Sequence, residues 1–238
     1  MPTIGLYQFD EEVGCGAIGR VYKGRHMRTN KNVAGKKITV EKEFYEEKYE
    51  KEARLVKDLP SHDNVVKVFG TEKREYKEGG VDYVELWIIS ELIPYSLKGF
   101  ASTYDLSVDH KLDLMVQCCR GLLHLHQHDL VHRDVKPENI MVDVNKGGKP
   151  VIKIIDFGEA RIVDEVEGRT ALMKSFVGTL EYMAPELLQR QGSLLTPNYR
   201  TSVDVFALGI TFLSLIESKK GQLMTVIKGM CFFSLLTN

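Results

Sequence analysis

The chain has 238 residues, with 32 Lys and Arg against 33 Asp and Glu, so its formal net charge is −1. Hydrophobic residues make up 43% and charged residues 27%, the balance of an ordinary globular protein. That balance leaves no basic excess for nucleic acid, and we expect no such partner. The longest apolar run, 206–216, has about half of the roughly 20 residues that a membrane-spanning helix needs, so we expect no membrane span.

The cysteines and the N-terminus predict the compartment. Cys118 and Cys119 are adjacent, whereas Cys15 and Cys231 lie far apart, so their spacing indicates neither a disulfide framework nor a paired-thiol metal site. Residues 1–12 lack the basic and apolar segments of a signal peptide. We therefore expect a cytoplasmic protein in a reducing environment.

The first part of the chain is predicted to form strands and one helix. Runs rich in β-branched and aromatic residues predict strands at Arg20–Lys23, Asn32–Thr39, Val65–Gly70 and Val84–Ser90. Apolar residues spaced three and four apart predict a helix over 41–59, which ends at Pro60. The polar, glycine-ended segment 73–80 predicts a hairpin connection.

The pattern changes after Pro94. Apolar spacing predicts a helix over 109–128, and a turn at 145–148 separates two short predicted strands, 140–142 and 151–155. From residue 202 onward the chain is predicted to be helical again. A small sheet-rich half followed by a helix-rich half predicts an α+β fold, with the boundary near residues 93–97.

The first motif that carries chemistry contains Gly14, Gly16 and Gly19. Glycines at this spacing let backbone N–H groups approach phosphate oxygens, because no Cβ obstructs them. Alone, the pattern also fits an ordinary turn, or a dinucleotide-binding unit in which a helix directly follows the glycines. Because the residues after Gly19 continue as a strand, the sequence favours a glycine loop between two strands.

A lysine in the next strand is a candidate partner for this loop. Lys36 lies 17 residues after Gly19, close enough to share a phosphate site, although a solvated lysine is the more usual interpretation. A buried ammonium group needs a carboxylate partner. Among the glutamates of the predicted helix we choose Glu52, because it lies one turn before Leu55 and Val56 and therefore borders the buried face.

The strongest signal is the run His132–Asn139, followed after 16 residues by Asp156. The carboxylate of Asp134, the ammonium group of Lys136 and the amide of Asn139 suit a site that accepts a proton, steadies a phosphate and ligates a hard cation. Asp156 adds a second oxygen ligand, and Mg²⁺ prefers oxygen donors. On these residues the chain resembles a eukaryotic protein kinase catalytic domain.

The resemblance implies a two-lobed protein-kinase-like fold over residues 9–238. We expect a small antiparallel-sheet N-lobe with one helix over 9–93 and a mainly helical C-lobe over 94–238. Only 34 residues follow Asp204, whereas the family has several more helices there, so the C-lobe is expected to be truncated and to lack its last helices. The apolar segment 230–236 has no clear family counterpart; it is interpreted as a cover for exposed core or as the mark of a fragment or splice variant.

The resemblance also implies catalytic roles. Asp134 is expected to be the catalytic base, and Lys136 to neutralise charge on the transferring phosphoryl group. Lys36 is expected to bind the ATP phosphates and to pair with Glu52. Asp204 is expected to hold the backbone of the loop that carries Asp134.

The expected cofactors are ATP and Mg²⁺, with Asn139 and Asp156 as the metal ligands. Ser90 occupies the gatekeeper position at the entrance to the hinge. The glycine loop, an apolar slot and the hinge backbone are expected to hold the nucleotide through Val13, Gly14, Gly16, Gly19, Val21, Ala34, Lys36, Glu91, Ile93 and Met141.

Further motifs indicate the branch of the family and its partners. Lys136 and the pair Gly178-Thr179 resemble the serine/threonine branch, so the expected partner is a protein substrate with a serine or threonine hydroxyl. Arg133 is typical of members that phosphate on the activation segment activates. This implies an upstream activating kinase, with Thr170 and Ser175 as the candidate acceptors.

Three functions stay open at this point. An active serine/threonine protein kinase is favoured, because every residue that the chemistry needs is present. The second function is a catalytically weak or inactive kinase-like module that binds ATP or a partner. A dehydrogenase-type nucleotide binder ranks last, because the strand after Gly19 and the loop 132–139 contradict it.

Overall fold

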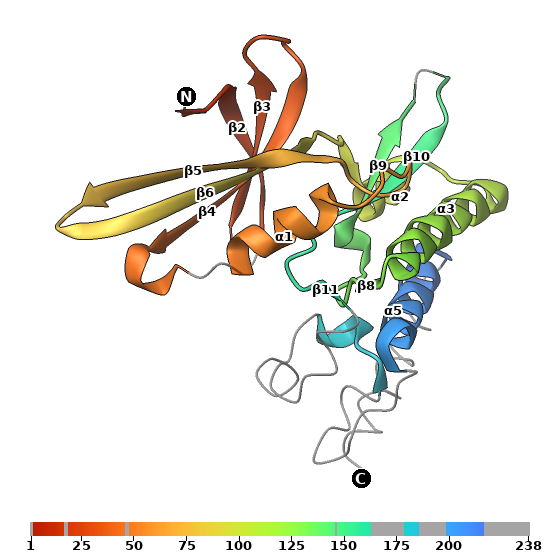
Figure 1. Ribbon diagram of the computed structural model, residues 1–238. Coiled ribbons are helices and arrows are strands. Elements are labelled where there is room, and N and C mark those ends of the chain that lie inside the picture. The colour runs from red at the N-terminus through yellow and green to blue at the C-terminus, as the bar shows by residue number, and fades with distance from the viewer. Residues whose placement is uncertain are drawn as a thin grey trace. The chain divides into compact units, whose positions relative to one another are not determined.

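A computed structural model describes residues 2–16, 19–45, 48–145, 147–162, 179–185 and 199–216 (Figure 1). The chain forms two compact units. Unit 1 comprises Met1–Ser61 and Val66–Ile93, and unit 2 comprises His62–Val65 and Pro94–Asn238.

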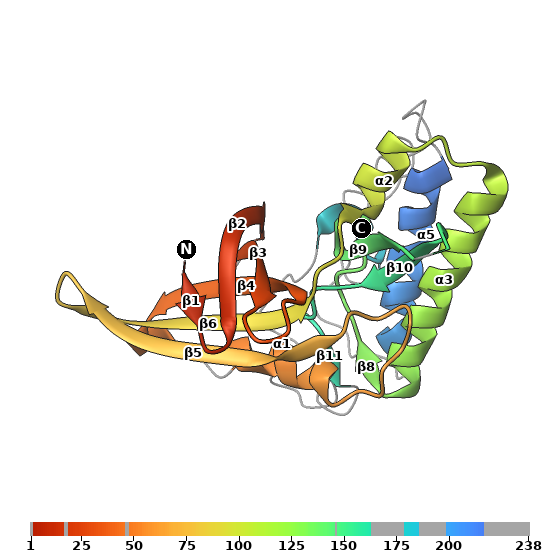
Figure 2. The same cartoon turned by 90° about the horizontal axis from the view of Figure 1, so that it is seen from above.

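Unit 1 is built on an antiparallel sheet whose six described strands have the order β1-β2-β3-β4-β6-β5. The strands are β1 (Thr3–Ile4), β2 (Tyr7–Cys15), β3 (Arg20–His26), β4 (Asn32–Glu41), β5 (Val68–Glu78) and β6 (Val81–Glu91). Figures 1 and 2 show the strong twist of this sheet, which turns β2 and β3 across the direction of β5 and β6. A 3₁₀ turn (Lys42–Phe44) and helix α1 (Lys48–Lys57) follow β4.

Strand β6 lies between β4 and β5, and its side chains are buried on both faces of the sheet. Trp87 and Ile89 belong to one apolar cluster, in which the ring of Phe9 stacks on Trp87 with 4.3 Å between centroids. Leu86 and Ile88 point to the opposite face, where they pack with Ile38 and with Ala53 of α1. This period-two alternation explains why a nearly continuous apolar run forms a central strand.

Unit 2 contains the described helices that follow α1. They are α2 (Leu97–Thr103), α3 (Val108–Gln127) and α5 (Tyr199–Ile216), and two of them, α3 and α5, are longer than α1. The side chains of Ser96 and Ser107 cap α2 and α3 by accepting hydrogen bonds from the N–H groups of Gly99 and His110. α3 and α5 lie side by side in both views (Figures 1 and 2).

Unit 2 also contains short strands, which form two small sheets. β7 (Tyr95–Ser96), β9 (Ile140–Val144) and β10 (Pro150–Ile154) form one small antiparallel sheet, and β8 (Leu130–Val131) pairs with β11 (Arg161–Ile162). Further 3₁₀ turns occupy Pro137–Asn139 and Leu180–Tyr182. The predicted α+β class, with an antiparallel-sheet first part and a mainly helical second part, is confirmed.

Three predicted elements are wrong in detail. Segment 73–80 is not a connection, because Lys73–Glu78 continues β5 and the turn is confined to Gly79 and Gly80, whose φ angles of 58° and 88° favour glycine. The helix over 41–59 is interrupted at Tyr45, which is extended. Val65 lies outside β5 and instead forms an isolated parallel bridge with Ile154 in unit 2.

The first difference arises because Lys73–Glu78 pairs with β6, and the second because Tyr45 contacts residues outside its own helical pattern. Lys73 lies over the ring of Tyr45, 4.3 Å from its centroid, and the hydroxyl of Tyr45 donates to Glu50 at 2.5 Å. The local sequence pattern cannot predict these contacts, because it places Lys73 in a polar loop and Tyr45 within a continuous helix.

The expected lack of helices after residue 216 concerns 217–238, outside the described residues. None of the described helices has the length and apolarity needed to cross a bilayer.

Candidate active site

The loop after β8 is held by one buried carboxylate. Asp204, on α5, is fully buried, and its two oxygens accept the backbone N–H groups of His132 at 2.8 Å and Arg133 at 2.7 Å. Its Oδ2 also lies 2.9 Å from Nε2 of His126. The expectation that Asp204 holds this loop is confirmed. Because Arg133 has a φ of 69°, these bonds also stabilise a backbone conformation that an L-residue rarely adopts.

His132 holds the same loop from within. Its Nδ1 accepts the N–H of Asp134 at 3.3 Å, so Nε2 carries the proton that bonds to the carbonyl of Ile155 at 2.9 Å. The imidazole is fully buried and packs against the ring of Phe157, with 5.1 Å between centroids. In the sequence, His132 is recognisable only as part of a motif, and this structural role is not predicted.

The carboxylate of Asp134 is the centre of a polar cluster. Its Oδ2 accepts hydrogen bonds from Nζ of Lys136 at 2.6 Å and from Nδ2 of Asn139 at 2.8 Å. Its Oδ1 accepts the backbone N–H and the hydroxyl of Thr179, at 3.1 and 3.2 Å. Nζ of Lys136 donates to the same hydroxyl at 2.8 Å. The side chains of Asp134 and Lys136 are only 12% and 21% exposed, so their mutual attraction is weakly screened.

Thr179 is therefore part of the cluster, although the sequence analysis used it only to indicate a branch of the family. Its signal in the sequence is its place next to Gly178, which lies outside the described residues. A hydroxyl that bonds to both Asp134 and Lys136 fixes the two charged groups relative to each other. This arrangement leaves a carboxylate that accepts protons next to a cation that attracts anions.

The backbone also brings the two predicted metal ligands near each other. The N–H of Ile155 donates to the carbonyl of Asn139 at 2.9 Å, which extends the β9–β10 ladder by one pair toward Asp156. Nδ2 of Asn139 donates to the carbonyl and to Oδ2 of Asp134. The amide oxygen of Asn139 is buried and has no donor among the described residues, and it is the kind of atom that a hard cation binds.

Asp156 has a left-handed backbone with a φ of 63°. Such a conformation is costly for a residue with a Cβ and is characteristic of functional sites. No group of three His, Cys, Asp or Glu side chains with metal-ligand spacing occurs among the described residues. A two-residue set of one amide and one carboxylate suits Mg²⁺, which keeps several waters and shares phosphate oxygens as ligands.

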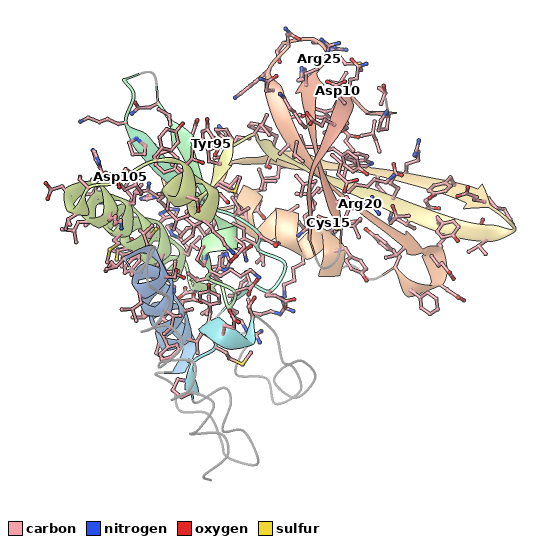
Figure 3. All side chains as sticks on the ribbon, turned by 180° about the vertical axis from the view of Figure 1, so that it is seen from behind. Asp10, Cys15, Arg20, Arg25, Tyr95 and Asp105 are labelled. Atoms are coloured by element: carbon pink, nitrogen blue, oxygen red, sulfur yellow. The ribbon has the colours of Figure 1, made fainter. Side chains whose placement is uncertain are left out.

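The glycine motif in unit 1 forms the turn between β2 and β3. The N–H of Gly16 donates to the carbonyl of Gly19 at 2.8 Å, and Cys15 pairs with Arg20 across the hairpin. Figure 3 shows Cys15 and Arg20 near the turn and Arg25 toward the other end of the hairpin. The predicted glycine loop between two strands is confirmed, which argues against a dinucleotide-binding unit.

A Cβ would be accommodated differently at two of these glycines. At Gly19 it would lie 2.4 Å from the carbonyl oxygen of Lys37, so the backbone would have to shift. At Gly16 the nearest atom would be the carbonyl oxygen of Gly19 at 3.6 Å, an ordinary contact. The close approach of β4 therefore requires a glycine at position 19. Packing does not require a glycine at position 16.

Four of the predicted nucleotide contacts of unit 1, Gly14, Val21, Ala34 and Lys36, share one face of the sheet. Gly14 pairs with Val21, Val21 with Lys36, and Ala34, two residues from Lys36, with Ser90. Directly paired residues and residues two apart point to the same side of a sheet. Val13 is half exposed. The side chain of Glu52, on α1, lies outside the described residues, so its expected pairing with Lys36 stays a prediction.

Glu91, a predicted hinge residue, forms hydrogen bonds with Lys67 inside unit 1. The N–H of Glu91 donates to the carbonyl of Lys67 at 3.0 Å, and the carboxylate of Glu91 accepts the N–H of Lys67 at 2.8 Å. The carbonyl of Glu91 accepts the hydroxyl of Ser90 at 3.4 Å. Ile93 is buried in unit 1, and Met141 is half-buried on β9 of unit 2.

The predicted phosphate acceptors Thr170 and Ser175 lie outside the described residues. Arg133, their predicted partner, is half-buried. Tyr182, in the 3₁₀ turn after Thr179, has its pKa raised to about 12 by burial and by the charges of Glu138 and Glu181. Its phenol is therefore neutral at physiological pH.

Comparison with known proteins places these features in a family. The protein kinase domain family matches residues 7–223. The chain is 32% identical over 223 residues to Misshapen-like kinase 1 of Rattus norvegicus and 30% identical over 222 residues to the serine/threonine-protein kinase mig-15 of Caenorhabditis elegans; each match covers 90% of this chain. It is 29% identical over 215 residues to the mitogen-activated protein kinase PMK1 of Pyricularia oryzae. The chain spans 15%, 19% and 56% of the lengths of these relatives. The chain therefore belongs to the protein kinase domain family.

Proposed function

We propose that this chain is a serine/threonine protein kinase that transfers the γ-phosphoryl group of ATP to a hydroxyl of a protein substrate. The observation that carries the proposal is the cluster around Asp134, in which Lys136, Asn139 and Thr179 all bond to one carboxylate. Family membership and the serine/threonine kinase relatives support the same reaction class.

In this proposal Asp134 is the catalytic base. Its carboxylate orients the substrate hydroxyl and accepts the proton as the hydroxyl oxygen attacks the γ-phosphorus, while the bond from this phosphorus to the bridging oxygen breaks and ADP leaves. Lys136, bonded to Asp134 at 2.6 Å, neutralises charge on the transferring group. Thr179 keeps both groups in place through its hydroxyl. Positioning and charge stabilisation of this kind supply most of the rate of phosphoryl transfer.

Asn139 and Asp156 would hold Mg²⁺, and the donor set fits, because a buried amide oxygen and a carboxylate are hard oxygen ligands. The ion, when bound, neutralises phosphate charge and orients the transferring group. Gly14, Gly16 and Gly19 would form the loop that covers the phosphates, because glycines have no Cβ to obstruct the approach of the backbone. Lys36, paired with Glu52, would bind the α- and β-phosphates.

The adenine would lie against Val13, Val21, Ala34 and Met141, and would bond to the backbone of Glu91 and Ile93. Within unit 1 the shared sheet face of Val21, Ala34 and Lys36 supports this assignment. We further propose that an upstream kinase phosphorylates Thr170 or Ser175 and that Arg133 pairs with the added phosphate. The free thiols of Cys15, Cys118 and Cys119 support a cytoplasmic location.

The test is phosphotransfer from Mg·ATP to a generic basic protein, with Asp134→Asn as the matched variant. We expect the variant to lose about 10²–10⁴-fold in rate, because it lacks the base. It should still bind Mg·ATP, measured as a rise in Tm, whereas NAD should leave Tm unchanged. Equal rates in the two proteins would contradict the role of Asp134. A wild-type chain that gains stability from Mg·ATP but transfers nothing would instead be a kinase-like binding module.

A further inference from the structure

Helix α3 carries a row of exposed apolar side chains. Val108, Leu112, Val116 and Leu123 are 72%, 50%, 46% and 56% exposed, and Cys119 is exposed between the last two. The spacings of four, four, three and four residues place all five on one side of the helix. We refer to these five residues as the α3 stripe.

The α3 stripe is distinct from the face that α3 buries. Leu114, Cys118, Gly121, Leu122 and Leu125 form the buried face. A surface helix normally has one apolar face and an opposite polar face. A second apolar row of about 22 Å, from the rise of 1.5 Å per residue, is the kind of exposed patch that marks an interaction site.

Helix α5, which lies beside α3, also exposes apolar side chains. Its sequence from Val203 to Ile216 is apolar on nearly every side, yet Val205 and Ile216 are 59% and 56% exposed. A helix that is apolar all round is normally covered all round. Asp204, near the start of α5, bonds to His126 near the end of α3, and the two helices run antiparallel (Figures 1 and 2). Ile216 therefore lies toward the first half of α3 and its stripe.

The chain itself supplies a candidate cover. The family match ends at residue 223, and the residues after it include a strongly apolar segment, Met230-Cys231-Phe232-Phe233-Ser234-Leu235-Leu236. The residues between Ile216 and Met230 reach at most about 45 Å when extended. This exceeds the length of the α3 stripe, so the segment can reach any part of it from the end of α5.

We propose that segment 230–236 docks on the α3 stripe and covers it. The occupant is argued from chemistry and from connectivity. Two phenylalanines, two leucines and a methionine match a row of valines and leucines that offers no charge. Because the segment is covalently attached, its effective concentration at the stripe is of millimolar order, which favours it over a separate partner of the same chemistry.

Cys119 is a native probe for this docking. We expect alkylation of Cys119, followed by peptide mass spectrometry of the full chain, to be about tenfold faster in a Phe232→Ser, Phe233→Ser double variant than in wild type. Cys118 does not interfere, because burial raises the pKa of its thiol to about 12. Cys15, in unit 1, is the internal control, and its rate should not change. An unchanged Cys119 rate would overturn the proposal.

A second measurement guards against a folding defect in the tail variant. Leu112→Ala with Leu123→Ala keeps helix propensity, because alanine is the best helix former, so the change is nearly neutral if the stripe is solvated. If the tail covers the stripe, we expect Tm to fall by roughly 3–6 °C. Combining these substitutions with the tail substitutions should then add little, since both remove one contact.

Arg120→Ala, on the polar side of α3, is the matched control and should leave Tm within about 1 °C. Additive losses of Tm from stripe and tail would overturn the docking. A Tm that rises with protein concentration, with a dimer in light scattering that Leu112→Ala and Leu123→Ala dissociate, would also overturn it, because a second copy would then be the cover. None of these readouts depends on phosphotransfer.

Discussion

Among the described residues, each unit has one fully buried carboxylate that accepts several hydrogen bonds, and the two have different roles. Asp204 of unit 2 is fully buried and accepts two backbone N–H groups of the loop that carries Asp134. Glu85 of unit 1 is 2% exposed. The contacts described for its carboxylate all come from side-chain donors: Lys37 at 2.7 Å, Arg74 at 2.9 Å and the indole N–H of Trp87 at 2.8 Å.

The difference lies in what the donors are attached to. Asp204 bonds to the backbone of His132 and Arg133, which lie outside the described strands, and Arg133 has a positive φ. The carboxylate therefore determines the shape of a loop. Glu85 bonds to side chains of strands that the sheet already holds. Removing Asp204 should therefore affect both stability and activity, and removing Glu85 should affect stability alone.

Of the substitutions that test this comparison, Asp204→Asn is expected to have the largest effect. The amide keeps the volume of the carboxylate but replaces one acceptor oxygen with a donor that faces backbone N–H groups, which leaves buried groups unpaired. We expect kcat to fall by about 10–100-fold with little change in KM for ATP, and the free energy of unfolding to fall by about 3 kcal/mol. Urea unfolding and phosphotransfer kinetics measure both. A variant that loses stability but keeps wild-type kcat would break the comparison.

A smaller effect is expected at the glycine turn, where backbone geometry rather than a carboxylate sets the shape. Gly19→Ala places a Cβ 2.4 Å from the carbonyl of Lys37 and must move the loop, whereas Gly16→Ala meets nothing closer than 3.6 Å. We expect Gly19→Ala to raise KM for ATP by about tenfold, or about 1.4 kcal/mol of binding, and Gly16→Ala to raise it less. Equal effects would mean that packing against β4 does not shape the loop.

The smallest effect on activity is expected for Glu85→Gln, and its effect on stability should depend on pH. Burial alone would raise the pKa of Glu85, but hydrogen bonds from Lys37 and Trp87 and the charges of Lys37 and Arg74 lower it overall. A carboxyl whose pKa is lower in the folded state stabilises the fold above the unfolded-state value of about 4.3, and that stabilisation disappears as the pH falls below it.

We therefore expect Glu85→Gln to cost about 1–3 kcal/mol at pH 7 and progressively less below pH 4, measured by urea unfolding across this range. Phosphotransfer at pH 7 should be unchanged. A loss of activity at full folding would show that Glu85 acts on the site and would remove the contrast with Asp204.

The sequence predicts the α+β class and most strands, because apolar periodicity reports which faces are buried. It fails at Lys73–Glu78, where a polar segment is a strand because its partner β6 is strongly apolar and supplies the ladder. It also gives no sign of the Glu85 cluster, since pairing of Lys37 and Arg74 with Glu85 depends on a three-strand register.

The candidate site divides in the same way. Asp134, Lys136 and Asn139 lie within six residues, so a motif predicts them together, and the structure places them in one hydrogen-bonded cluster. Thr179 lies 45 residues beyond Asp134 and joins the cluster through folding alone. His132 has a structural role that only its two ring-nitrogen bonds identify.

The central claim is that the carboxylate of Asp134 accepts the proton in a phosphoryl transfer to a serine or threonine. The most direct measurement is a single-turnover assay with Mg·ATP and a protein acceptor, with the Kd for Mg·ATP determined on the same samples. We expect phosphate on serine or threonine, and a rate at least about 100-fold lower in Asp134→Asn while the Kd changes by less than about threefold. A wild-type rate in Asp134→Asn would contradict the account.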